Sequence, residues 1–210
     1  LIGWFWSPLY FFGLVLTLWC VYFFRNPVRV TPILSGINKN NLVIAPADGR
    51  VIEISQITPE KEIGLPVGNW TRVCIFMNVF DVHVNRSPML GKIFYKNYIP
   101  GSFFNASLDK ASSKNERLIL GMDTENGKKI AFVQIAGLVA RRIICDVDIG
   151  SSLKVGEVFG LIRFGSRVDV YFPSDVSVMV LKGQKMIAGE TIIGDFTKSS
   201  KSVKDNIDEK

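Results

Sequence analysis

Residues 167–172 read RVDVYF, a run in which polar and apolar side chains alternate. This period of two places Val168, Val170 and Phe172 on one face of a β-strand. Other strand-like runs, rich in β-branched and large apolar residues, lie at 72–79, 129–135, 158–163 and 176–181. Short strands at this spacing predict a mainly β domain. We expect a compact β-sandwich or a domain similar to the barrel-sandwich hybrid of biotinyl and lipoyl domains.

An apolar segment precedes these strands. Residues 1–24 contain no charged side chain, and residues 9–24 are almost wholly apolar. Because about 20 apolar residues suffice to cross a bilayer, we predict an N-terminal transmembrane helix as an anchor at residues 1–26. A signal peptide or a buried core helix is the alternative, but the segment ends without a small-residue cleavage site.

The residues after the anchor predict how the rest of the chain is arranged. Arg25 and Arg29 follow the apolar segment directly, which by the positive-inside tendency predicts a cytoplasmic domain on the inner cell membrane. We place this domain at residues 27–197. Residues 198–210 are rich in Ser, Lys and Asp and are predicted to be a disordered tail.

The composition limits the classes of partner. Hydrophobic residues make up 48% of the chain and charged residues 21%, as in a globular protein. The net charge of +6 suits an anionic partner, either a nucleic acid or an anionic membrane. Because no Lys/Arg run with interleaved aromatic residues stands out, we expect no nucleic-acid partner. Cys20, Cys74 and Cys145 fit no zinc or CxxC spacing and are predicted to be reduced thiols.

His83 is the only histidine in the chain. A zinc hydrolase normally needs at least two His or Cys ligands close together, so we expect no metal site. A lone histidine among strand residues is more often structural than catalytic. The neighbouring Asp81, Asn85 and Arg86 make this a polar strand end, which leaves a catalytic role open.

Asp48 lies in the sequence Pro-Ala-Asp-Gly at 46–49. The simplest interpretation is a tight Asp-Gly hairpin turn between strands at 42–44 and 51–54. The carboxylate could instead orient the single histidine, as the acid does in a catalytic triad.

Gly165-Ser166 lies between two apolar strand-like runs and not in a polar loop. Glycine permits a strained backbone beside its own carbonyl. A serine hydroxyl next to such a carbonyl can attack it and move the acyl group from nitrogen to oxygen. A base can then remove the serine Cα proton and eliminate the ester, and hydrolysis leaves an N-terminal pyruvoyl group. This chemistry needs a hydroxyl, a base and a strained peptide, and the sequence supplies a candidate for each.

Three motifs taken together resemble a known family. Pro-Ala-Asp-Gly at 46–49, Asp-Val-His-Val-Asn-Arg at 81–86 and Gly-Leu-Ile-Arg-Phe-Gly-Ser-Arg-Val-Asp at 160–169 are similar to the short, bacterial and archaeal type of phosphatidylserine decarboxylase. Stretches at 98–106, 115–117 and 134–142 are also similar to that family, and the resemblance covers about residues 24–194.

The resemblance implies a self-processing precursor. By position, the family's processing Asp, His and Ser fall on Asp48, His83 and Ser166. Cleavage between Gly165 and Ser166 would give a β chain of residues 1–165 and an α chain of residues 166–210. The α chain would begin with a covalent pyruvoyl cofactor made from Ser166.

The resemblance also implies the reaction. The pyruvoyl carbonyl would form a Schiff base with the amine of phosphatidylserine, and loss of carbon dioxide would lead to phosphatidylethanolamine. His83 would donate or position a proton, Asp48 would set the His83 tautomer, and the enzyme is expected to be a homodimer. Headgroup contacts are not assigned; the candidates by charge are Arg86, Arg141, Arg142 and Arg167.

Two other functions use the same features. An ordinary serine hydrolase could employ Asp48, His83 and Ser166 as a triad with the chain intact, although the Gly-x-Ser-x-Gly pattern is absent. A non-enzymatic biotinyl or lipoyl carrier would need a lysine presented between two methionines. Lys185-Met186 is the nearest match and lacks the first methionine.

Overall fold

The computed structural model describes residues 2–32, 39–104, 106, 114–138, 142–163 and 165–199. In this part of the chain one α-helix, α1 (Ile2–Phe23), and two short 3-10 helices, η1 (Lys39–Asn41) and η2 (Lys61–Ile63), accompany a set of β-strands. The strands are β1 (Leu42–Ile44), β2 (Gly49–Ile57), β3 (Trp70–Met77), β4 (Val84–Arg86), β5 (Gly91–Ile99), β6 (Arg117–Thr124), β7 (Lys129–Ile135), β8 (Ile143–Cys145), β9 (Ser152–Leu153), β10 (Val158–Ile162), β11 (Ser166–Pro173), β12 (Val176–Val178), β13 (Lys185–Met186) and β14 (Ile192–Ser199).

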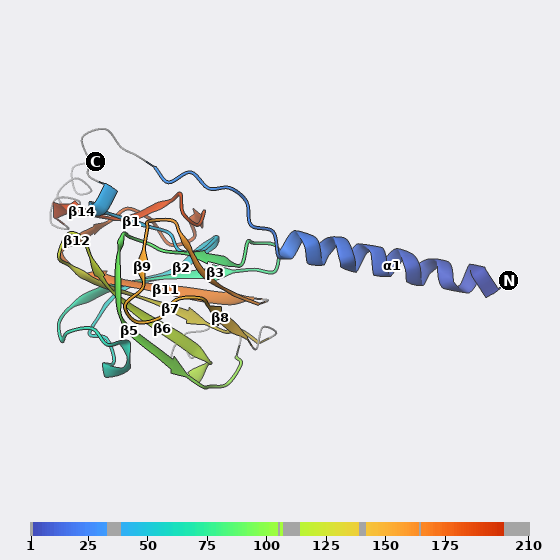
Figure 1. The fold of residues 1–210 in the computed structure, drawn as a ribbon, viewed down its shortest axis with the longest axis horizontal. Helices are drawn as coiled ribbons and strands as arrows, with labels where there is room; N and C mark the ends of the chain where they lie inside the picture. Colours follow the sequence, from blue (N-terminus) through green and yellow to red (C-terminus); the bar gives the residue numbers. More distant parts are fainter. Residues whose placement is uncertain are drawn as a thin grey trace.

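The described strands form three antiparallel sheets. The largest has eight strands in the order β13-β2-β3-β11-β7-β6-β5-β9, and the two smaller sheets have the orders β1-β14-β12 and β4-β10-β8. The predicted mainly β class is therefore confirmed. β11 lies in the interior of the large sheet, hydrogen-bonded to β3 on one side and β7 on the other. Hydrogen bonding to these two strands therefore fixes the position of β11 in the sheet (Figure 1).

One hydrophobic core joins the three sheets. Its buried members include Val43 of β1, Ile75 of β3, Phe159 of β10, Val168 of β11 and Ile193 of β14. The face of β11 predicted to be apolar points into this core, since Val168, Val170 and Phe172 are all fully buried. The alternating pattern therefore predicted the correct buried face.

The polar face of β11 is also buried, which the alternating pattern did not predict. Arg167 and Asp169 have no exposed surface and pair through two hydrogen bonds from the guanidinium to the carboxylate. Nη2 of Arg167, which is one of the two donors, also contacts Sγ of Cys74 at 2.8 Å. A second apolar cluster, which includes Ile119, Val133 and Tyr171, lies on the same side of the sheet. Burial of both faces requires that the two charges neutralise each other.

The predicted Asp48-Gly49 hairpin is wrong. β1 pairs with β14, whereas β2 pairs with β3 and β13, so the residues after β1 lead from one sheet to another. Gly49 has a φ of 138°, and a Cβ on it would lie 2.1 Å from the Phe76 carbonyl oxygen. The glycine is needed because the backbone passes so close to β3 and not because of a two-residue turn.

Helix α1 projects from the β domain, and its C-terminal end meets the strands (Figure 1). The segment predicted as an anchor is thus helical. However, none of the helices in the described residues is long and apolar enough to cross a membrane, so the predicted transmembrane helix is not supported. At the other end β14 runs to Ser199. The rest of the predicted tail, residues 200–210, lies outside the described residues.

The buried ion pair on β11 gives a prediction about stability. Asp169→Asn leaves the Arg167 guanidinium buried without its counter-charge, which typically costs about 3–5 kcal/mol. The double variant Arg167→Met/Asp169→Leu replaces both charges with apolar groups and should recover most of that loss. Urea unfolding of the three proteins measures the difference. Equal losses in the single and double variants would contradict the ion-pair explanation.

Candidate active site

The Gly165–Ser166 peptide lies where the chain enters β11. Gly165 has a φ of 63°, a left-handed conformation that costs a residue with a Cβ about 1–2 kcal/mol. The Ser166 side chain is fully buried, and its Oγ lies 4.0 Å from Sδ of Met77, its cross-strand partner on β3. A thioether is a weak acceptor. The hydroxyl is therefore kept from water, has no strong partner among the described residues, and lies next to a peptide in a glycine-specific conformation.

His83 is placed directly at this peptide. Its side chain is 2% exposed, and its Nε2 accepts a hydrogen bond from the Gly165 N–H at 3.2 Å. Its Nδ1 lies 2.9 Å from the carbonyl oxygen of Asp81. Because Nε2 accepts, the ring proton sits on Nδ1 and is donated to that carbonyl. The structure thus brings His83 to the residue before Ser166, as a shared role in processing requires.

The surroundings of His83 favour its neutral form. Burial lowers the pKa of His83 to about 4, and the positive charge of Arg25 contributes in the same direction. The hydrogen bond to the Asp81 carbonyl and the more distant charge of Asp48 act in the opposite direction but are outweighed. At neutral pH the ring is uncharged, and its Nε2 can take up a proton as a general base must.

The end of α1 supplies part of this burial. The Phe23 side chain is 1% exposed, and its ring centroid lies 4.3 Å from that of His83 with 34° between the planes. Two residues later, Arg25 donates to the carbonyl oxygen of Phe80 at 3.0 Å. Sequence reasoning assigned residues 1–26 to an anchor alone and missed this contact, because nothing local in the sequence links Phe23 to His83.

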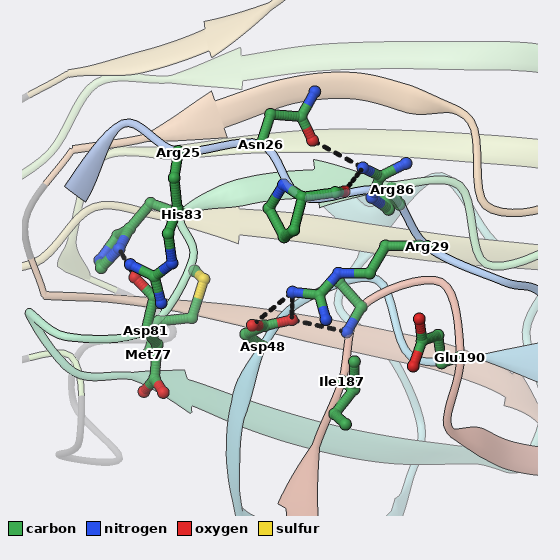
Figure 2. A network of polar contacts seen from close by, with 12 residues as sticks. Arg25, Asn26, Arg29, Asp48, Met77, Asp81, His83, Arg86, Ile187 and Glu190 are labelled. Atoms are coloured by element: carbon green, nitrogen blue, oxygen red, sulfur yellow. Dashed lines mark hydrogen bonds and ion pairs between the residues drawn. The ribbon is translucent and has the colours of Figure 1, made fainter. Parts of the chain in front are cut away.

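Asp48 is not in contact with His83 in the way the triad interpretation predicted. Its carboxylate accepts hydrogen bonds from Nη2 of Arg29, at 2.8 and 3.0 Å, and from the backbone N–H of Ala188 at 2.8 Å (Figure 2). The Nδ1 position that Asp48 was expected to occupy is taken by the Asp81 carbonyl. The physical reason is that Arg29 offers the carboxylate a full counter-charge.

Gly137 is a residue of the site that the sequence analysis included in the stretch 134–142 without assigning it a role. A Cβ on Gly137 would lie 1.7 Å from the carbonyl oxygen of Gly165. Any side chain at position 137 would therefore displace the carbonyl that Ser166 would attack. The glycine could have been singled out only by knowing that β7 and β11 are neighbours.

The four arginines named as headgroup candidates have different surroundings. Arg86 donates to backbone and side-chain oxygens of the segment that follows α1 and to the carbonyl of Gly156. Arg167 is fully buried with its carboxylate partner, so its charge is not available at the surface. Arg142 is exposed, and Arg141 lies outside the described residues.

Comparison with known proteins gives the family. A sequence model described as phosphatidylserine decarboxylase matches residues 16–194. The phosphatidylserine decarboxylase proenzyme of Rickettsia bellii (strain OSU 85-389) is 57% identical over 184 residues, which are 88% of this chain and 78% of that protein. The proenzymes of Rickettsia akari (strain Hartford) and Rickettsia prowazekii (strain Madrid E) are 56% and 55% identical over the same shares. This chain belongs to the phosphatidylserine decarboxylase family.

The resemblance drawn from the sequence is confirmed at the level of the phosphatidylserine decarboxylase family. All three motifs, at 46–49, 81–86 and 160–169, fall inside the matched range. The processing roles of Asp48, His83 and Ser166 within this family member stay predictions.

The burial of His83 gives a prediction about pH. With a pKa of about 4 in the folded chain and about 6.5 when unfolded, His83 binds its proton first in the unfolded state. Folding stability should therefore fall as the pH drops from about 6.5 to 4. Between pH 7 and 4.5 the protonation of His83 should lower the free energy of unfolding by roughly 2–3 kcal/mol.

The measurement compares urea unfolding of Ser166→Ala with Ser166→Ala/His83→Gln, so that the chain stays uncut in both. The loss of stability between pH 7 and 4.5 should be larger when His83 is present. Adding Phe23→Ala to the first protein should reduce that loss, because it admits water to the ring. Identical pH dependence in all three proteins would show that His83 is not held neutral by burial.

Proposed function

We propose that this chain is the precursor of a phosphatidylserine decarboxylase that cleaves itself between Gly165 and Ser166 and then converts phosphatidylserine to phosphatidylethanolamine. The observation that carries the proposal is the position of the neutral His83 at the Gly165 N–H, beside the buried hydroxyl of Ser166. The relatives described above are named proenzymes, which supports a precursor that is processed.

The first step is an acyl shift within the chain. Oγ of Ser166 attacks the carbonyl carbon of Gly165, the C–Oγ bond forms, and the C–N bond to Ser166 breaks. The hydroxyl proton ends on the released Ser166 nitrogen, and His83 Nε2 is the base that the geometry offers for this transfer. The left-handed Gly165 supports the step because its carbonyl is presented without a Cβ beside it.

The second step is elimination. A base removes the Cα proton of residue 166, the Cβ–Oγ bond breaks, and the electron pair stays on Oγ as part of a Gly165 carboxylate. Water then hydrolyses the dehydroalanine that remains and releases ammonia, which leaves a pyruvoyl group at the start of the α chain. The site fits this product, because position 166 is fully buried opposite the apolar Met77 of β3, and Gly137, which follows β7, leaves room at the Gly165 carbonyl.

The pyruvoyl group supplies an electron-withdrawing carbonyl that makes loss of carbon dioxide from an amino acid headgroup feasible. Among the described side chains, His83 is the one placed to hold a proton at this point of the site. Its apolar cover, which includes the Phe23 ring, limits access of water to that proton. Asp48 fixes Arg29 and the segment after α1 over the same region, so its role is to position that segment (Figure 2).

Intact mass spectrometry tests the proposal. The wild type should give two chains, and the smaller one should start at residue 166 with the mass of its serine reduced by one ammonia. Ser166→Ala should stay whole, because it lacks the attacking hydroxyl. A single unmodified chain in an active wild-type preparation would rule out the pyruvoyl and favour a serine hydrolase that uses the same residues.

The proposal extends to the membrane. Apolar side chains of α1 such as Tyr10, Phe11, Leu18 and Val21 are 60% to 75% exposed, which is unfavourable in water. We infer that α1 inserts into lipid, where the substrate resides, with its C-terminal end at His83. The basic residues after α1 favour the cytoplasmic side of the inner membrane, which protease treatment of spheroplasts and inverted vesicles would test.

A flotation assay tests the contact of α1 with lipid. The wild type should float with phosphatidylserine vesicles, and Phe11→Glu/Val21→Glu should remain at the bottom, because burying the two carboxylates in lipid is unfavourable. Both proteins should cleave themselves equally, since neither position lies at the cleavage site. Equal flotation of the two proteins would contradict insertion of α1.

The family resemblance also supports a homodimer of the processed protein. Light scattering after size exclusion in detergent should show twice the summed mass of one α and one β chain. A mass equal to one α chain plus one β chain would contradict the homodimer.

A further inference from the structure

Two buried amide side chains are linked by hydrogen bonds to Met77, the residue opposite Ser166, and have no part in the steps above. Asn85 has no exposed surface and Gln134 is 1% exposed. The Gln134 Nε2 donates to Oδ1 of Asn85 at 2.8 Å. The Asn85 Nδ2 in turn donates to the Met77 sulfur at 3.7 Å, the same atom that the Ser166 hydroxyl contacts.

The hydrogen bonding of this pair is incomplete. Within the described residues Oε1 of Gln134 is buried without a partner. A thioether is a weak acceptor, so the Asn85 N–H group that reaches Met77 is only weakly satisfied. Burying amides in this condition costs free energy that an apolar pair of the same size would not cost. A further polar group near Met77 could therefore accept the hydrogen bond that the Asn85 N–H now makes only weakly.

Strand pairing places Gln134 opposite Val168 of β11 and Met77, which Asn85 contacts, opposite Ser166. The side chains of these paired residues therefore share the interior face of the large sheet. Asn85 comes from β4 in the smaller sheet opposite, two residues after His83. Residues two apart in an extended chain project to the same side. His83 and Asn85 thus approach the cleavage site together, His83 at Gly165 and Asn85 at the sulfur beside Oγ.

We propose that Asn85 is a catalytic residue of the elimination step and that Gln134 is its positioning residue. When the Cβ–Oγ bond breaks, the electron pair moves onto Oγ, which becomes part of the Gly165 carboxylate. The Asn85 N–H group, released from the weak sulfur contact, donates a hydrogen bond to that oxygen. Gln134 holds Asn85 by its Oδ1 so that the N–H side faces the reaction. The inference rests on the proposed self-cleavage and assigns a residue to one step of it.

The two steps of processing should depend differently on the Asn85 amide. The acyl shift leaves an ester between Gly165 and Oγ that carries no new charge, whereas elimination creates a carboxylate in a buried site. A buried donor stabilises the charged product far more than the neutral ester. Loss of the Asn85 amide should therefore leave the ester in place and slow its elimination.

The experiment follows the chain with and without hydroxylamine, by intact mass, in wild type, Asn85→Leu, Gln134→Met and Ser87→Ala. Hydroxylamine cleaves an ester at Gly165 and releases an α chain that still begins with an unmodified serine. Asn85→Leu should form the pyruvoyl chain about 10- to 100-fold more slowly and give the serine chain with hydroxylamine. Gln134→Met should show the same change to a smaller degree, because the donor is retained but less well held.

Ser87→Ala is the matched control. Ser87 is fully buried and donates to the Met89 carbonyl at 2.7 Å, so the variant also loses a buried hydrogen bond, but outside this network. It should process at the wild-type rate.

Two results overturn the proposal: wild-type processing in Asn85→Leu, or a folded Asn85→Leu that forms neither pyruvoyl nor a hydroxylamine-sensitive ester. If Asn85→Leu does not fold, Gln134→Met decides between the same results. A wild type that stays uncut would overturn the proposed function itself.

Discussion

The site depends on the hydrogen bond between the Gly165 N–H and Nε2 of His83. This bond fixes the histidine tautomer, because an accepting Nε2 leaves the proton on Nδ1. The bond also requires that the Gly165 N–H point to His83 and not to a neighbouring strand, and the left-handed conformation of Gly165 allows this. The rest of the structure keeps these two partners in register: β3 and β7 hold the start of β11, and the Asp81 carbonyl holds the other side of the ring.

Burial is what gives this arrangement its chemistry. The interior that contains His83 and Ser166 lowers the pKa of the histidine and removes water from the hydroxyl. The same interior makes every polar group near it costly unless the group is paired. Arg167 and Asp169 neutralise each other on the opposite, also buried face of β11, where among the described residues only Nη1 of Arg167 lacks a partner in this pair. Asn85 and Gln134 are paired only in part, which is why they are informative about the reaction.

The segment after α1 connects the two halves of the proposed function. Phe23, the last residue of α1, covers His83, and Arg29 in the segment that follows binds Asp48. The chain at this point therefore contacts two of the predicted processing residues. The predicted acid is still a neighbour of the site, but it hydrogen-bonds to Arg29 and to the Ala188 N–H and acts on the histidine only through its charge.

The sequence by itself determined the strand class and the buried face of β11, because both follow from local periodicity. It also made the Gly165-Ser166 peptide a candidate, because its two residues are adjacent in the chain. His83 was predictable as a candidate because it is the only histidine. Only the tertiary structure decided which groups surround them. Phe23 at His83, Gly137 at the Gly165 carbonyl, Arg29 at Asp48 and Gln134 at Asn85 all join residues distant in sequence. The physical reason is that strand order in a sheet is set by packing of the whole core, and no local pattern encodes which strands become neighbours.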